Sequence, residues 1–179
     1  MIVKHSKVSS IGDESNVDLI RPSDWNDKHE VTGRACFSDH KAVGTAGGSA
    51  SAATWHTRVL NTTEYNNISD CSLASNQITL GAGTYRIKAS SPVICVGQHK
   101  IALYNVTDAV YSFDGTSEYA DPANIANRAF MNSQIIISTQ KVFELRHYCT
   151  FEKTGDGLGV TSNIGNYELY AIIEIEKIS

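Results

Sequence analysis

Residues 141–151, KVFELRHYCTF, carry the pattern that decides the fold. Apolar and polar side chains alternate strictly along this stretch, and such a period of two is typical of a β-strand with one face on a core. The side chains that we expect on the core face are Phe143, Leu145, His147, Cys149 and Phe151. We therefore predict a half-buried strand here.

The same alternation recurs across the C-terminal two thirds of the chain. It is present in TYRIKASSPV (84–93), HKIALYNVT (99–107) and ELYAIIEIEKI (168–178). The segments between these runs, such as FDGT (113–116) and TGDGLG (154–159), are rich in the Gly, Asn and Asp that strand-connecting turns need. No capped amphipathic helix interrupts the series. About eight strands in roughly 125 residues predict an all-β sandwich or jelly roll rather than an open barrel.

The chain divides into three regions by composition. Residues 1–33 are polar and irregular, which predicts an extended N-terminal segment. Residues 34–54 include the small-residue tract VGTAGGSASAAT, from which we predict a flexible linker. Residues 55–179 contain the strand series and form the predicted β-domain.

Some strands also carry large side chains on the face that should meet water. They are Tyr104, Tyr148, Tyr170 and Ile172. A row of tyrosines on an outer face favours a subunit interface, because the ring can be buried while the hydroxyl finds a partner. Scattered surface aromatics are the alternative.

Charge and hydropathy exclude several classes of partner. The chain has 179 residues, 19% of them charged, with a net charge of −4 and no long basic run. This composition does not favour nucleic-acid binding or attraction to anionic membranes. No apolar run approaches the length of a spanning helix, and the N-terminus has no apolar signal core. We expect a soluble protein made in a cytoplasm.

The cysteines allow two interpretations. Cys36, Cys71, Cys95 and Cys149 form no CxxC pair, so a zinc ribbon or redox motif is not expected. They are either buried thiols that pack as small apolar groups, which we favour, or one or two disulfides formed outside a reducing compartment.

Motifs for catalysis or cofactor binding are missing from the sequence. The six histidines show no metal-ligand spacing, and the glycine-rich segments lack the GxxxxGK[ST] pattern of a phosphate-binding loop. We expect no cofactor, no metal site and no catalytic residues. An enzyme whose two carboxylates are brought together only by the fold stays as a less favoured alternative.

One N-terminal tract resembles a known group of proteins. The segment IRPSDWNDKHEVTG (20–33) resembles a tract near the start of bacteriophage tail-fibre and tail-tip subunits, with Trp25 in a polar string. A Trp and an Arg in a segment stiffened by proline suit an interface with another chain. We predict that Arg21, Pro22, Asp24 and Trp25 form an assembly element; a turn packed on the β-domain is the alternative.

A second resemblance covers the β-domain. The strand series resembles the C-terminal modules of such phage proteins. The matching features are Trp55, Arg58, Leu60 and Asn61, the segments ITLGAGTYRI and ALYNVTD, and the last strand. Those modules are similar to trimeric jelly rolls of the C1q and tumour-necrosis-factor type. The resemblance implies a C1q/TNF-like jelly roll, a homotrimer, and a place in a virion assembled in the bacterial host cytoplasm.

The resemblance also implies a function. We expect a short trimeric fibre or knob that attaches to tail, collar or capsid proteins through its N-terminal segment and recognises a host-surface glycan. Candidate receptor-loop residues, chosen because loops on a rigid domain carry specificity, are Tyr111, Tyr119, Asn124 and Asn163. The alternatives are a capsid, collar or neck decoration protein without a ligand, and a polysaccharide-degrading enzyme.

Overall fold

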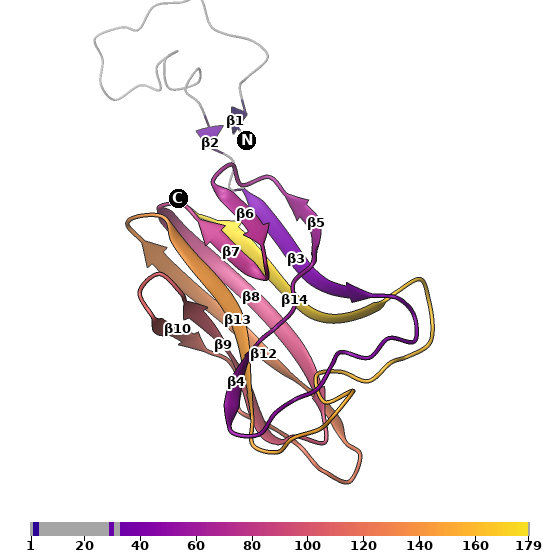
Figure 1. Cartoon of the computed structure of the whole chain (residues 1–179). Helices are drawn as coiled ribbons and strands as arrows, with labels where there is room; N and C mark the ends of the chain where they lie inside the picture. Colours follow the sequence, from indigo (N-terminus) through magenta and orange to yellow (C-terminus); the bar gives the residue numbers. More distant parts are fainter. Residues whose placement is uncertain (1, 4–28, 31–32, 179) are drawn as a thin grey trace, which may run out of the picture.

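The computed structural model describes residues 2–3, 29–30 and 33–178, and the regular secondary structure within these ranges is entirely β (Figure 1). The strands are β1 (Ile2–Val3), β2 (His29–Glu30), β3 (Arg34–Lys41), β4 (Thr54–Thr57), β5 (Thr62–Asn66), β6 (Cys71–Ala74), β7 (Gln77–Leu80), β8 (Gly83–Ile94), β9 (Gly97–Asn105), β10 (Val110–Asp114), β11 (Glu118–Ala120), β12 (Ala126–Ile137), β13 (Lys141–Cys149) and β14 (Glu168–Lys177). None of the described segments is a helix long and apolar enough to cross a membrane. The all-β prediction is confirmed.

Two antiparallel sheets form the domain. One has five strands in the order β12-β8-β14-β3-β5. The other has seven: a path β10-β9-β13-β7-β6, with β11 pairing β9 and β4 pairing β13. The short strands β1 and β2 form a separate two-stranded sheet. Because neighbours such as β3 and β14 come from opposite ends of the domain, its fold depends on pairings between distant segments.

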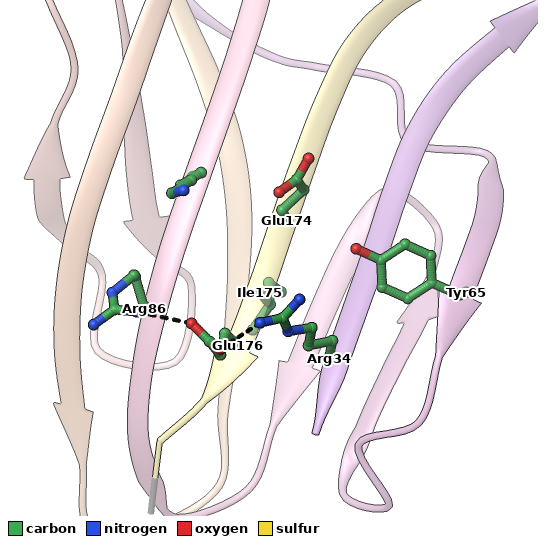
Figure 2. A pocket seen from close by; sticks show the side chains of 7 residues that line it. Arg34, Tyr65, Arg86, Glu174, Ile175 and Glu176 are labelled. Atoms are coloured by element: carbon green, nitrogen blue, oxygen red, sulfur yellow. Dashed lines mark hydrogen bonds and ion pairs between the residues drawn. The ribbon is translucent and has the colours of Figure 1, made fainter. Parts of the chain in front are cut away.

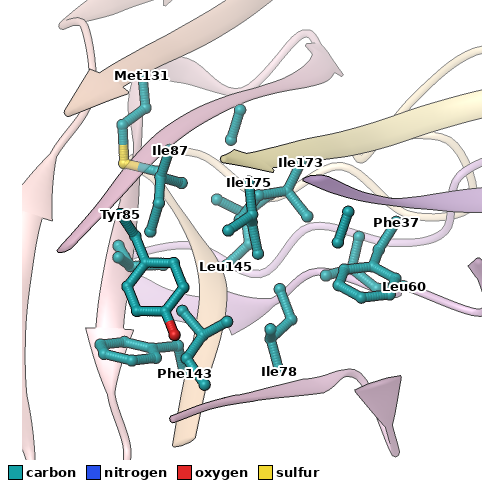
Figure 3. Packing of buried hydrophobic residues seen from close by; sticks show 14 of the residues in the cluster. Phe37, Leu60, Ile78, Tyr85, Ile87, Met131, Phe143, Leu145, Ile173 and Ile175 are labelled. Carbon is teal, nitrogen blue, oxygen red and sulfur yellow. The ribbon is translucent and has the colours of Figure 1, made fainter. Parts of the chain in front are cut away.

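The core lies between the two larger sheets and is built by the alternation seen in the sequence. Tyr85 and Ile87 of β8, Phe143 and Leu145 of β13, and Ile173 of β14 are all at most 1% exposed and pack together (Figure 3). The Tyr85 hydroxyl donates to the Gly81 carbonyl at 3.0 Å, so even this polar atom is satisfied inside the core. Burying such side chains is the main stabilising contribution to a sandwich of this kind.

The predicted core face of residues 141–151 is confirmed for its first four members. Phe143, Leu145, His147 and Cys149 are buried. Phe151 is half exposed because β13 ends at Cys149 and the chain turns away before it.

The flexible linker predicted for residues 34–54 needs correction. Residues Arg34–Lys41 form β3, which lies between β14 and β5 and places Phe37 in the core. The small residues that follow permit close packing: a Cβ on Gly47 would lie 2.5 Å from the Leu158 carbonyl oxygen, and Ala50 is buried. The sandwich therefore begins near residue 33, and the Gly/Ala/Ser tract is one of its packed loops.

All four cysteines are free, buried thiols. Burial raises the pKa of Cys71 to about 12 and that of Cys149 to about 11. Both thiols therefore stay protonated near neutral pH, and in this uncharged form they pack as small apolar groups.

Both ends of the sandwich leave from one pole. The Lys177 amide donates to the Gly33 carbonyl at 2.9 Å, so the first described residue of the domain lies beside the end of its last strand. The loops around residues 42–53, 94–97, 121–125 and 150–167 gather at the opposite end (Figure 1). Backbone hydrogen bonds tie these loops together, including Gly47 to Gly159 and Cys95 to Ile125. We call this end the distal pole.

Candidate functional site: a charged sheet face and an aromatic groove

The outward face of the five-stranded sheet carries a charged cluster at the pole of the termini. Arg34 of β3 and Arg86 of β8 reach the same Glu176 carboxylate of β14 from either side, at 3.0 and 2.9 Å (Figure 2). The hydrogen bond from Arg34 is the largest of the effects that lower the pKa of Glu176. With Lys88, Glu174 and Tyr65, these side chains line a small hollow of about 110 Å³.

An apolar hollow follows on the same face. It has a volume of about 360 Å³, and its lining includes Phe130 of β12 and Ile172 of β14. Phe130 is 53% exposed, and Ile136, six residues farther along the same face of β12, is 76% exposed. The outward face of this sheet therefore combines exposed apolar side chains with a charged cluster of both signs.

The seven-stranded sheet carries an aromatic cluster on its own outward face. Because β4 pairs with β13, Trp55 lies directly opposite Tyr148, and their rings meet edge to face with centroids 5.4 Å apart. The pairing of β10 with β9 likewise brings Tyr111 opposite Tyr104, at 4.9 Å. Tyr111 also lies 4.8 Å from Trp55, which joins the two pairs. The Arg146 guanidinium lies 3.5 Å from the centre of the Tyr104 ring, a cation–π contact.

An open groove runs beside this cluster in the distal half of the sheet. Its volume is about 780 Å³, which lies in the range of about 300–1,000 Å³ usual for small-molecule sites. We call it the aromatic groove. The residues that line it are Trp55, Gln98, His99, Lys100, Ser117, Glu118, Tyr119, Asn127, Tyr148 and Thr150.

Two buried histidines lie behind the groove. The Nδ1 atom of His99 is 3.0 Å from the Nε2 atom of His147, and both residues are at most 3% exposed. Burial lowers the pKa of His99 to about 4, against a smaller opposing effect of Glu118, and lowers the pKa of His147 well below its usual value. Both rings are therefore neutral near pH 7. The Nε2 atom of His99 and the Nδ1 atom of His147 have no hydrogen-bond partner.

The loops of the distal pole are held by one carboxylate. Glu168 accepts hydrogen bonds from the amides of Gly44 (3.1 Å), Ser162 (2.9 Å) and Asn163 (2.9 Å), and a further one from the Ser162 hydroxyl (2.9 Å). These bonds, with that from Ser162 the strongest, lower the pKa of Glu168 to about 2. The carboxylate thus stays ionised and fixes loops that are distant in sequence.

The four residues predicted to form one intersubunit face lie on different sheets. Tyr104 and Tyr148 belong to the aromatic cluster of the seven-stranded sheet, whereas Tyr170 and Ile172 lie on β14 of the five-stranded sheet. Tyr170 is buried, and its hydroxyl donates to the Thr45 carbonyl at 2.8 Å. Only Ile172 lines the apolar hollow.

The predicted receptor-loop residues fall into two groups. Tyr111 and Tyr119 lie on the seven-stranded sheet, where Tyr111 contacts Trp55 and Tyr119 lines the aromatic groove. Asn124 and Asn163 lie in loops of the distal pole with φ angles of 76° and 55°, a backbone conformation that asparagine tolerates better than most residues. The predicted assembly element, Arg21, Pro22, Asp24 and Trp25, lies outside the described residues.

Sequence reasoning missed the groove itself. Trp55 entered only as part of a family resemblance, and Gln98, Glu118 and Asn127 were not singled out. The available signal was only Trp55 in the short strand-like run TWHT. Among the residues that the structure describes, no three His, Cys, Asp or Glu side chains gather as a metal site would require.

Comparisons with known proteins define the fold. No protein-family model matches the chain, and no curated protein sequence matches it significantly. Solved structures do match. Eiger TNF from S. frugiperda aligns with a TM-score of 0.57 at 13% identity, over 84% of this chain and 94% of that one. Murine APRIL at pH 5.0 aligns with a TM-score of 0.54 at 6% identity, over 83% and 100%.

A third solved structure, the globular domain of zebrafish complement 1qA protein, aligns with a TM-score of 0.48 at 13% identity, over 84% of this chain and 98% of that one. At these identities the comparisons describe architecture. The all-β domain is a jelly roll of the tumour-necrosis-factor type, and the predicted C1q/TNF-like fold is confirmed.

Proposed function

We propose that this chain is the knob-forming subunit of a bacteriophage virion appendage. In this proposal three copies assemble into a short fibre or knob, the N-terminal segment attaches it to tail, collar or capsid proteins, and the exposed part recognises a host-surface glycan. The protein is a binding and structural component without catalytic activity.

The placement of the two ends of the sandwich supports this proposal most directly. Because Gly33 and Lys177 are hydrogen-bonded neighbours, an anchor made from residues 1–33 joins the domain at the pole opposite the distal loops. A domain attached in this way exposes its distal pole and the distal half of the outward face of its seven-stranded sheet to the surroundings. Loops and grooves on a rigid β-scaffold are common positions for recognition.

The outward face of the five-stranded sheet is the surface that we assign to the trimer. Phe130 and Ile136 are exposed apolar residues on β12, and Ile172, which is level with Phe130, lines with it a hollow that a neighbouring side chain can fill. The adjacent Arg34–Glu176–Arg86 cluster adds charges of both signs, which favour one relative orientation of the copies. Apolar centres with polar surroundings are the usual composition of subunit interfaces.

The trimer is tested by light scattering on the full chain. We expect three times the 19.5 kDa chain mass for the wild type and a lower mass for Ile172→Arg, which places a charge in the apolar hollow. Val110→Arg is the matched control, because Val110 is half exposed on the other sheet. A monomeric wild type would contradict the trimer.

The attachment to a virion needs its own test. We expect Trp25→Ala to reduce incorporation of the protein into particles while leaving its mass in solution unchanged. Normal incorporation of this variant would contradict the assembly role of the N-terminal segment. Purified protein should also compete with particles for adsorption to host cells; failure to compete would favour the decoration role without a ligand.

A further inference from the structure

We propose that the aromatic groove is a saccharide-binding site for an uncharged pyranose sugar, formed where the rings of Trp55 and Tyr148 lie beside the side chains of Gln98, Glu118 and Asn127. This inference rests on the proposed function as a glycan-recognising knob and adds the position of the site and the class of sugar. It differs from recognition by the distal loops, because most of the groove lies on the flank of the seven-stranded sheet.

The aromatic side of the groove suits the apolar face of a sugar ring. A pyranose presents C–H groups on its flat faces and hydroxyls around its edge, so it needs a flat apolar surface with polar groups beside it. Trp55 and Tyr148 provide such a surface, and Tyr119, which is 48% exposed, lies on the neighbouring edge strand β11. Aromatic rings with a polar atom are well suited to this partly wet contact.

The aromatic rings are already held in place. Trp55 packs against Tyr148 at 5.4 Å and against Tyr111 at 4.8 Å, and Tyr111 packs in turn on Tyr104. A ring fixed by its neighbours loses little conformational freedom when a ligand stacks on it, and this loss normally weakens binding. The cluster thus explains why a partly exposed Trp is retained on an outward sheet face.

The polar side of the groove offers oriented hydrogen-bonding groups. The Thr150 hydroxyl donates to Gln98 Oε1 at 2.8 Å, which fixes the Gln98 amide. The Asn127 amide donates to Glu118 Oε2 and to the Tyr119 carbonyl, both at 3.3 Å. A few fixed amides and a carboxylate on an otherwise apolar wall are the usual means by which a site recognises the hydroxyls of a ligand.

The charges of the groove favour an uncharged sugar over an acidic one. Its lining has one cation and one anion, Lys100 and Glu118. The Lys100 ammonium already pairs with Asp114 at 3.2 Å, whereas a carboxylate or phosphate on the ligand would be repelled by Glu118. No second cation lies among the lining residues to recognise an anionic sugar.

Ligand-detected NMR titration of the full-length protein tests the site. The probes are the methyl glycosides of glucose, galactose, mannose and N-acetylglucosamine, with N-acetylneuraminic acid as the anionic comparison. We expect at least one neutral glycoside to bind in the millimolar range usual for a monosaccharide that makes few contacts, and the anionic sugar to bind at least ten-fold more weakly. Preferred binding of N-acetylneuraminic acid would overturn the assignment to uncharged sugars.

Variants locate the binding. Trp55→Ala should weaken it at least ten-fold, and Trp55→Phe should retain most of it because a flat ring remains. Phe113→Ala is the matched control: Phe113 is an exposed aromatic residue on β10, outside the groove lining, and its loss should leave the affinity unchanged. Unchanged affinity in Trp55→Ala, or no binding of any neutral glycoside, would overturn the proposal.

The outcome for this site can be separated from that for the proposed function. If neutral glycosides do not bind but the purified protein still blocks particle adsorption, the saccharide site is wrong and receptor recognition stands. If glycosides bind through Trp55 but the protein does not block adsorption, the site stands and the role as a receptor knob is wrong.

Discussion

The buried His99–His147 pair should make the domain sensitive to mild acid. In the unfolded chain both imidazoles take up a proton near the ordinary histidine pKa of 6.5, whereas in the folded domain burial lowers the pKa of His99 to about 4 and lowers that of His147 well below its ordinary value. Below pH 6.5 the unfolded state therefore binds more protons than the folded state. The free energy of unfolding falls as the pH drops from 6.5 toward 4.

The expected loss follows from these pKa shifts. A pH of 5.5 lies one unit below the unfolded pKa and well above the folded pKa of His99, and burial keeps His147 neutral in the same way, so each histidine removes about 1.4 kcal/mol from the free energy of unfolding. Between pH 7.5 and 5.5 the pair should therefore remove roughly 3 kcal/mol. This is a large part of the total of about 5–15 kcal/mol typical of a domain. Carboxyl groups contribute little in this window because they ionise at lower pH.

Urea unfolding at pH 7.5 and 5.5 measures this loss of stability. Both titrations use the same protein concentration, because association of the chains also stabilises the folded state. With a slope near 2 kcal/mol per molar urea, the wild-type midpoint should fall by more than about 1 M. In His147→Gln, which removes one of the two titrating groups, the difference between the two pH values should shrink by about half.

The control separates titration from general loss of stability. Ile101→Val alters the cross-strand neighbour of His147 and costs about 0.5–1.5 kcal/mol at both pH values without removing a titrating group. It should keep the full difference between pH 7.5 and 5.5. Equal wild-type stability at the two values, or an unchanged difference in His147→Gln, would refute the reasoning.

Three further predictions concern the core, the distal pole and the thiols. Leu145→Ala should lower the free energy of unfolding by about 2–5 kcal/mol in urea titration, because Leu145 is fully buried between the sheets; a loss below 1 kcal/mol would contradict the packing. The pKa of Glu168 is lowered to about 2, so the stability it provides is present above about pH 4.5 and lost toward pH 2. Glu168→Gln should weaken that acid dependence and speed hydrogen exchange at Gly44, Ser162 and Asn163, whereas unchanged exchange would exclude its role in holding the loops. A thiol reagent at pH 7.5 should modify the native protein slowly and the urea-unfolded protein rapidly, because all four thiols are buried in the fold: Cys36, Cys71, Cys95 and Cys149. Fast labelling of the native protein would contradict their burial.

The fold could be predicted because its signal is local. Alternation along residues 141–149 requires only the neighbouring side chains, and Phe143, Leu145, His147 and Cys149 are buried as predicted. The alternation misled where the backbone departs from a regular strand. The register of β14 shifts between Leu169 and Ile172, so Leu169 is 40% exposed and Tyr170, which was predicted on the outer face, is buried.

The candidate groove could not be predicted because it depends on pairings between distant segments. Trp55 reaches Tyr148 only through the pairing of β4 with β13, and Tyr119 reaches Gln98 only through the pairing of β11 with β9. No short stretch of sequence contains this information. The small-residue tract within residues 34–54 was wrongly predicted to be a flexible linker, because glycine is favoured both in flexible segments and where backbones pack closely. Gly47 is an example of close packing, since it lies against the backbone of Leu158.

The common exit of both ends at one pole has a mechanical consequence. A pull between an anchor at residue 33 and a ligand held near the distal half runs along the strands, so the hydrogen bonds between β3 and β14 are loaded in shear. In this geometry the bonds across the ladder share the load and must yield together, whereas a pull across the strands would open them one at a time. In the attachment that we propose, the domain would thus be oriented to resist a pull between its anchor and its ligand.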